Sequence, residues 1–350
     1  MTAAETRRPR GEEPMVPRAE FRSYYGLPVI KEPVWRAPDV PGYLFLGGLA
    51  GASSALAAGA ELAGRHELAR AAKTAAAGAI SLSSVALVHD LGRPARFLNM
   101  LRVFKPTSPM SVGSWLLAAY GPAAGAAAAS ALTGLLPGVG RAATVAAAVT
   151  GPGVAAYTAA LLSDTAVPAW HEAHRELPYL FVSSAATAAG GLALIAVAPE
   201  QAGPARNLAL AGAAAEITVK SMLLQRLGPS AEPYQSGRAG RLMEAAEILT
   251  AAGLAAAAVS GRNRAATAAA GAALVASSAL TRFGIFYAGL TSARDPRYTI
   301  GPQKTAARAA QGEGRLRQLG AGAGTPSGRP RVRPAAGAGS RLRRILRPSG

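Results

Sequence analysis

The chain contains no cysteine, and this absence excludes several classes of protein. A disulfide scaffold, a thiolate zinc site, a cysteine-ligated iron–sulfur cluster and a cysteine nucleophile all require that residue. Histidine is also scarce, with four in 350 residues, so a histidine-rich metal site is not expected. We therefore expect this chain to bind neither a metal ion nor haem.

Charged residues are also scarce. Charged residues make up 16% of the chain, whereas a typical soluble domain has about 25%. Seven of the 37 lysines and arginines precede Pro41, and 13 lie from Arg294 onward. The body between these two basic ends is apolar, which indicates an integral membrane protein.

Eight segments are apolar enough to cross a bilayer core of about 30 Å, which takes roughly 20 helical residues. Many of them are rich in alanine and glycine, which let neighbouring helices pack closely. A soluble helical bundle would carry charges along one face of each helix, but residues 142–163 carry none. We therefore predict an all-α, multi-pass protein of the cell membrane with eight transmembrane helices. The predicted segments are 42–60, 72–89, 110–134, 142–163, 179–198, 207–224, 243–260 and 265–290.

Eight crossings place both termini on the same side of the membrane. If that side is the cytoplasm, the inner segments hold 15 lysines and arginines before the tail is counted, against seven in the outer loops. The positive-inside rule therefore predicts cytoplasmic termini. We expect a cytoplasmic segment at 1–40, a membrane domain at 41–292 and a basic, disordered, lipid-facing tail at 293–350. The first forty residues are polar and rich in proline, so no cleavable signal peptide is expected.

Polar and ionisable residues gather near the predicted inner ends of the helices. Such residues near a membrane interior are functional candidates. The second segment ends at His89-Asp90, and the otherwise uncharged fourth segment ends at Asp164. The remaining candidates on this side are Tyr43, Arg93, Tyr157, Trp170, His171 and Arg282.

A cluster of His, Asp and Tyr at the edge of a helical bundle suits a quinone. The head group needs hydrogen-bond donors or acids at its carbonyls and a proton route to water, and its tail needs an apolar crevice. Histidine exchanges protons near neutral pH, and a nearby carboxylate raises its basicity. Tyrosine offers a hydroxyl donor on a rigid apolar ring.

Several of these residues also have structural explanations. Arg93 is a plausible positive-inside determinant, and Tyr43 and Trp170 lie where aromatic belts are routine. His171 is equally explained as an ordinary loop histidine. Glu216 and Lys220, four residues apart in the sixth segment, can form an ion pair that neutralises itself.

Short sequence strings resemble the NrfD/PsrC family, the membrane subunits of polysulphide reductase and its relatives. The most specific part connects the second and third segments, with Asp90-Leu91-Gly92-Arg93-Pro94 followed by Ser108-Pro109-Met110-Ser111-Val112-Gly113-Ser114-Trp115. Gly47-Gly48-Leu49-Ala50-Gly51, Tyr157-Thr158 and Arg282 with Ala288-Gly289 continue it. The resemblance extends over about residues 24–304.

This resemblance implies two four-helix bundles and a subunit that oxidises or reduces quinone (menaquinone or ubiquinone) but is not a complete enzyme alone. It implies a partner iron–sulfur protein with four clusters, which is linked to a molybdopterin oxidoreductase. The pocket tyrosine of the family corresponds to Tyr157. The polar His and Asn of the first family helix have no counterpart here, where Tyr43 occupies that region.

Two other classes of membrane protein remain as alternatives. A haem-bearing anchor needs two facing histidines within the membrane, and only His89 touches a predicted span. A secondary transporter tends to show matched helix interruptions in two repeats, and Gly151-Pro152-Gly153 has no such match. A nucleic-acid partner is not expected, because the basic tail has no interleaved aromatic residues.

Overall fold

The computed structural model describes residues 29–91 and 95–300, and within these ranges every regular element is helical. Eight of the helices are long, and three short α-helices and a 3₁₀ turn lie between them. The long helices are α1 (Asp39–Leu62), α2 (His66–Asp90), α4 (Pro109–Thr133), α5 (Pro137–Ser163), α7 (Leu177–Ala196), α8 (Gly203–Leu227), α10 (Gly237–Val259) and α11 (Arg264–Arg294). The short elements are α3 (Ala95–Met100), α6 (Pro168–Glu172), η1 (Gly228–Ala231) and α9 (Glu232–Gln235).

In the part of the chain that the structure describes, these eight long helices are long and apolar enough to cross a membrane. The prediction of eight segments is therefore confirmed. The helix ends differ most in α2 and α10, which begin at His66 and Gly237 rather than at residues 72 and 243. In α2 the difference has a clear reason. The first two turns of α2 contain Glu67, Arg70 and Lys73. These charged residues lower the hydropathy, so the predicted segment began later, but they do not interrupt the helix.

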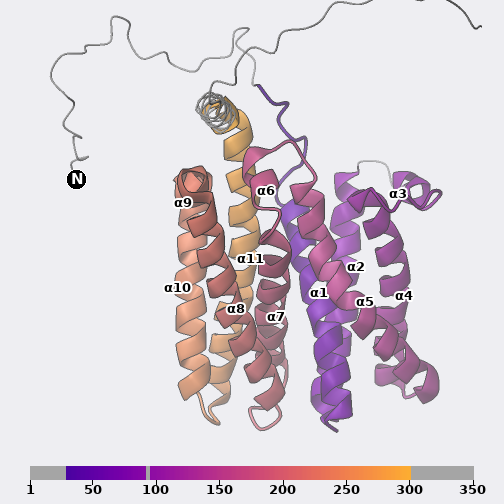
Figure 1. Ribbon diagram of the computed structural model, residues 1–350. Coiled ribbons are helices and arrows are strands. Elements are labelled where there is room, and N and C mark those ends of the chain that lie inside the picture. Colours follow the sequence, from indigo (N-terminus) through magenta and orange to yellow (C-terminus); the bar gives the residue numbers. More distant parts are fainter. Residues whose placement is uncertain (1–28, 92–94, 301–350) are drawn as a thin grey trace, which may run out of the picture. The chain divides into compact units, whose positions relative to one another are not determined.

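The three short α-helices lie at the same end of the long ones, with α9 and α3 on opposite sides of it (Figure 1). The first turn of α1 and the last turn of α11 meet at this same end. Arg294 at the end of α11 pairs with Glu32, which precedes α1, at 2.5 Å. We call this the α3/α6/α9 end of the protein.

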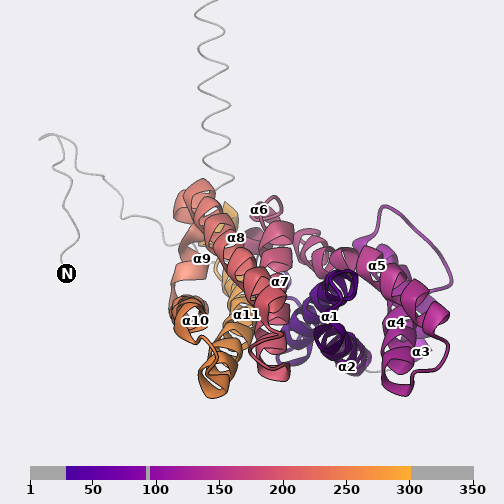
Figure 2. The same cartoon turned by 90° about the horizontal axis from the view of Figure 1, so that it is seen from below.

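Helix α1 packs against α2 and α5 on one side and against α7 and α11 on the other (Figure 2). Helices α4 and α5 pack together, as do α7 with α8 and α10 with α11. Gly51 of α1 and Gly151 of α5 bring the backbones of these two helices into contact. A Cβ atom built on either glycine would overlap the backbone carbonyl group of the other. The glycine string of α1 thus permits backbone contact between helices, as small residues do in membranes.

A partly exposed ion pair joins the start of α7 to the end of α8. Arg226 donates to both carboxylate oxygens of Glu176, at 2.5 and 2.6 Å, and also to the carbonyl oxygen of Glu172. These hydrogen bonds hold the pKa of Glu176 below its usual value. The pair therefore stabilises the fold at neutral pH, when Glu176 is charged.

Candidate functional site

A cavity of about 90 Å³ lies at the α3/α6/α9 end, among the first turns of α1 and α4, the last turns of α2 and α5 and the end of α3. Consecutive long helices run antiparallel, so the start of one lies beside the end of the next. Most of the wall is apolar, and its polar side chains are Tyr43, Asp90, Ser114 and Tyr157. The other lining residues are Trp35, Val40, Leu87, Leu91, Met100, Met110, Leu117 and Leu161.

Tyr43, which is buried, and Tyr157, which is partly buried, both contribute to the wall. Tyr43 is 5% exposed, and its backbone carbonyl oxygen accepts a hydrogen bond from Ser83 of α2 at 3.1 Å. The side chains of Tyr157 and Asp90 are its electrostatic neighbours. One cavity therefore presents two phenol groups and one carboxyl group, each from a different helix.

The position of Tyr157 depends on a glycine in the facing helix. A Cβ atom on Gly113 of α4 would overlap the Tyr157 ring. Gly113 belongs to the string Ser108–Trp115 that precedes and opens α4. The absence of a side chain at this point allows the Tyr157 ring to lie directly against α4 beside the cavity.

Asp90 and His89 are neighbours in the sequence but differ in environment. Successive helical residues point about 100° apart, and Asp90 lines the cavity while His89 does not. The Nδ1 atom of His89 lies 3.0 Å from Oδ2 of Asp39, and its side chain is 75% exposed. Charged groups near Asp90 are Asp39, Arg36 and His89. The carboxyl group of Asp90 thus faces the cavity at the C-terminal end of α2.

The family model described as polysulphide reductase, NrfD, matches residues 30–205, which is half of the chain. The chain belongs to this NrfD family. It is accordingly a membrane protein, from a family of membrane subunits of quinone-linked oxidoreductase complexes. A search of curated proteins gave no significant match. The residues that line the cavity all fall within the part that the NrfD model covers.

Three of the predicted site residues are exposed and lie outside the cavity of this NrfD protein. His89 faces outward, as described above. Asp164, directly after α5, is exposed. His171 is exposed on α6, where its Nδ1 atom lies 3.1 Å from the carbonyl oxygen of Ser163. Arg93 falls outside the described residues.

Trp170 and Arg282 are buried but do not line the cavity. Trp170 is fully buried, donates from Nε1 to the carbonyl oxygen of Ile285 at 2.8 Å and stacks on Trp35 with ring centroids 5.5 Å apart. Trp170 is therefore not part of an aromatic belt at the membrane surface. It packs against Trp35, which lines the cavity. Arg282 is 1% exposed and donates to the carbonyl oxygen of Phe181. Its side chain therefore lies inside the protein, against α7.

The structure also adds residues that the sequence analysis did not select. Trp35 lies in the segment before α1, which was expected to be cytoplasmic, yet it forms part of the cavity wall. Ser114 and Met110 lie in the string that opens α4, so the family motif was the available signal for them. Nothing in the local sequence signals the contribution of Met100, because it depends on the path of the chain after α2.

The interpretation of Glu216 and Lys220 as an ion pair is corrected. Lys220 pairs with Glu247 of α10 at 2.5 Å, and Glu216 instead accepts a hydrogen bond from Thr281 of α11 at 2.9 Å. Spacing along one helix favours such a pair, but residues from neighbouring helices are better placed here. Among residues 29–91 and 95–300, no group of three or more potential ligands is arranged to hold a metal ion.

Proposed function

We propose that this protein is the quinone-reactive membrane subunit of an oxidoreductase complex, which exchanges electrons and protons between the quinone pool and a partner iron–sulfur protein. The observation that carries the proposal is the cavity that Asp90, Tyr43 and Tyr157 line at the α3/α6/α9 end. An apolar pocket with a few convergent polar groups is typical of a small-molecule site. Membership in the NrfD family supports quinone as the substrate.

The lining residues suit the two parts of a quinone. The hydroxyl groups of Tyr43 and Tyr157 can donate hydrogen bonds to its carbonyl oxygens, and the Asp90 carboxylate can accept a proton from the reduced form. Leu87, Leu117 and Leu161 offer apolar surface to the ring and the start of the tail. Met100 and Met110 have flexible side chains that adapt to different shapes, so the cavity can enlarge around a head group.

Proton transfer and electron transfer take separate routes in this proposal. Oxidation of one quinol releases two protons and two electrons. Asp90, at the helix end, passes the protons toward water. The electrons pass to the iron–sulfur partner, which binds at the α3/α6/α9 end and relays them to a molybdopterin subunit.

The same proposal includes the arrangement in the membrane. The helices form two four-helix bundles, α1, α2, α4 and α5 in one and α7, α8, α10 and α11 in the other. Segment 1–40 and the tail 293–350 lie in the cytoplasm with the α3/α6/α9 end. The excess of lysine and arginine in the predicted inner segments supports this orientation.

Tryptophan fluorescence tests quinone binding directly, because the chain has three tryptophans and Trp35 lies in the cavity wall. Titration of the purified full chain with a short-chain quinone should quench its fluorescence to saturation. Trp35→Phe should remove most of the saturable quenching. Trp115→Phe should retain it, because Trp115 is 42% exposed and does not line the cavity. Absence of saturable quenching, or its loss only in Trp115→Phe, would contradict the proposal.

A further inference from the structure

Two further cavities lie beside α8 and α10, away from the proposed quinone site. One measures about 270 Å³ and extends from Glu216 and Thr281 to Lys220 and Glu247. The other measures about 340 Å³ and extends from Lys220 and Glu247 to Tyr234 and Gln235 of α9. They share Lys220, Leu224 and Glu247. Together they outline a passage along α8 and α10, from the middle of α8 to the α3/α6/α9 end. The wall of the inner cavity is mostly apolar, and Lys220, Glu247 and Glu244 are ionisable groups along the passage, which has room for several water molecules.

Glu216 lies at the inner end of this passage. At 1.5 Å per residue it is about 16 Å from the end of α8 at Leu227, near the middle of the helix. The residue is 5% exposed. Its Oε1 atom accepts a hydrogen bond from Thr281, whereas Oε2 is buried with no hydrogen-bond partner in the described part of the chain. An acidic group placed this deep in a membrane is costly and marks a functional position.

The nearest positive charge does not neutralise Glu216 by contact. Arg282 of α11 is within electrostatic range, but no ion pair joins the two residues in the described ranges. The guanidinium of Arg282 instead lies over the Phe181 ring, 3.9 Å from its centroid, and donates to the Phe181 carbonyl oxygen. Glu216 is therefore not locked as the charged member of a salt bridge.

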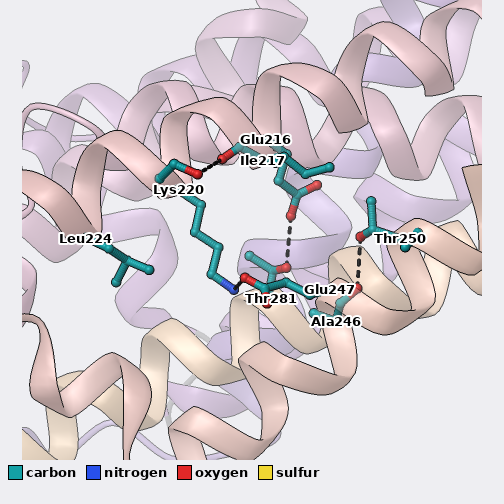
Figure 3. Close-up of a pocket in the computed structure, with 10 residues that line it drawn as sticks. Glu216, Ile217, Lys220, Leu224, Ala246, Glu247, Thr250 and Thr281 are labelled. Carbon is teal, nitrogen blue, oxygen red and sulfur yellow. Dashed lines mark hydrogen bonds and ion pairs between the residues drawn. The ribbon is translucent and has the colours of Figure 1, made fainter.

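The passage carries further ionisable groups between Glu216 and the helix end. Lys220, on the same helix, pairs with Glu247 of α10 and donates to the carbonyl oxygen of Met243 at 3.3 Å (Figure 3). The Glu247 side chain is 57% exposed, and Glu244 lines the outer cavity. The groups that face Glu216 are thus Arg282 and Thr281 of α11, Ser184 of α7, Lys220 of α8 and, across the cavity, Glu247 of α10.

We propose that Glu216 is an internal proton-binding site that exchanges protons with water at the α3/α6/α9 end through this passage. A proton from water moves past Glu244 and the Lys220–Glu247 pair and binds to Oε2 of Glu216. Only an O–H bond forms at Glu216 and only an O–H bond breaks at the donor, so no electron is transferred. The site is separate from the proposed quinone cavity and gives the C-terminal half of the chain its own proton-transfer activity.

Infrared difference spectroscopy of the full chain in lipid nanodiscs at low and high pH tests this proposal. A protonated carboxylic acid has its own carbonyl stretching band, which disappears on ionisation. The band should be present in the unmodified protein and absent from Glu216→Gln. It should persist in Glu61→Gln, the control, because Glu61 pairs with Lys73 at 2.9 Å and lines neither of the two cavities. A band unchanged in Glu216→Gln, or no titrating band, would overturn the proposal.

A separate measurement tests whether protons reach Glu216 through the passage. Transfer to heavy water shifts the same band, and the rate of that shift reports access to Glu216. Glu247→Gln, which disrupts the Lys220 pair, should change that rate several-fold without removing the band; an unchanged rate would overturn the assigned route. Should Glu216→Gln fail to fold, a hydrophobic carbodiimide applied to the unmodified protein should label Glu216 at low pH and lose that labelling as pH rises. Absent or pH-independent labelling would contradict the proposal.

The two proposals can fail separately. Asp90→Asn should leave the Glu216 band intact, because Asp90 lies in the other half of the chain. Absence of saturable quinone binding in the unmodified protein, with the Glu216 band retained, would contradict the quinone site alone. Loss of the band with retained quinone binding in Asp90→Asn would contradict the assignment to Glu216.

Discussion

The two halves of the chain place their polar groups at different depths. Helices α1, α2, α4 and α5 gather Tyr43, Asp90 and Tyr157 around a cavity at the helix ends, whereas α8, α10 and α11 place Glu216 near the middle of the membrane domain. A site at the helix ends is accessible to a large amphipathic molecule and to a partner protein. A buried carboxyl group at the inner end of a passage lined by Lys220 and Glu247 is accessible to water and protons. Depth along the helix thus separates the functions that the two regions can support.

The family match also distinguishes the two regions. It covers residues 30–205 and therefore the whole cavity lining of the first half, but it ends near the start of α8. The proposal for Asp90 and Tyr157 is supported by family membership as well as by geometry. The proposal for Glu216 rests on geometry alone.

The largest effect should come from Asp90→Asn, which removes the only carboxyl group of the described cavity lining. We expect quinol-dependent electron transfer by the complex to fall by about 100-fold, a typical contribution of a general acid or base. Asp164→Asn is the matched control and should retain activity, because Asp164 is exposed and lies outside the cavity. Equal losses in both variants would remove the distinction between cavity and surface.

Gly113→Ala should be the next most damaging change. The added methyl group overlaps the Tyr157 ring, so we expect a loss of about 1–3 kcal/mol in stability from overpacking, together with weaker quinone binding. Thermal unfolding in detergent and quinone titration measure the two effects. Gly121→Ala, in the same helix, meets no atom within 4 Å and should be nearly neutral. Wild-type behaviour of Gly113→Ala would show that the Tyr157 position is not fixed by α4.

Tyr157→Phe should have a smaller effect on turnover. It removes one hydroxyl group and keeps the ring against Gly113, so we expect at most about a tenfold decrease, as for the loss of one neutral hydrogen bond. Tyr120→Phe serves as the control, because the Tyr120 hydroxyl bonds to Ser54 at 2.8 Å and does not line the cavity. Steady-state kinetics with quinol should separate them, and a larger loss in Tyr120→Phe would argue against a role for Tyr157.

The smallest effect should come from Glu176→Gln, which weakens the contact between α7 and α8 but leaves both sites in place. We expect a loss of about 1 kcal/mol at neutral pH, because Arg226 is partly exposed and solvent screens the pair. The pKa of Glu176 is lowered in the folded protein. The stabilisation is therefore present above the unfolded pKa and disappears as pH falls through the folded value. Melting curves of the two proteins should converge in acid, and a constant difference at all pH values would contradict this explanation.

Much of the architecture could be predicted from the sequence, because a bilayer imposes a length and a hydropathy on each crossing. The eight spans and the α4 motif are visible in the chain itself. The sequence could not show that Asp90 faces the cavity while His89 faces outward, since this depends on which face of α2 packs against α1. The burial of Trp170 depends equally on distant parts of the chain, namely Trp35 and the α11 backbone at Ile285.

The pairing of Lys220 illustrates the same limit. The sequence offers Glu216 four residues away, but the three-dimensional arrangement brings Glu247 closer from α10. Local spacing identifies possible partners, and helix packing selects among them. Sequence reasoning therefore located the polar regions more reliably than it identified the contacts within them.

Photolabelling with an azido-quinone tests the central claim most directly. The full chain, labelled in its native membrane and digested for peptide mass spectrometry, should carry the label on the residues around the cavity, such as Met100 and Met110, and excess unlabelled quinone should suppress it. Asp90→Asn should reduce this labelling. Suppressible labelling confined to α8 and α10 would contradict the placement of the quinone site at the ends of α1, α2, α4 and α5.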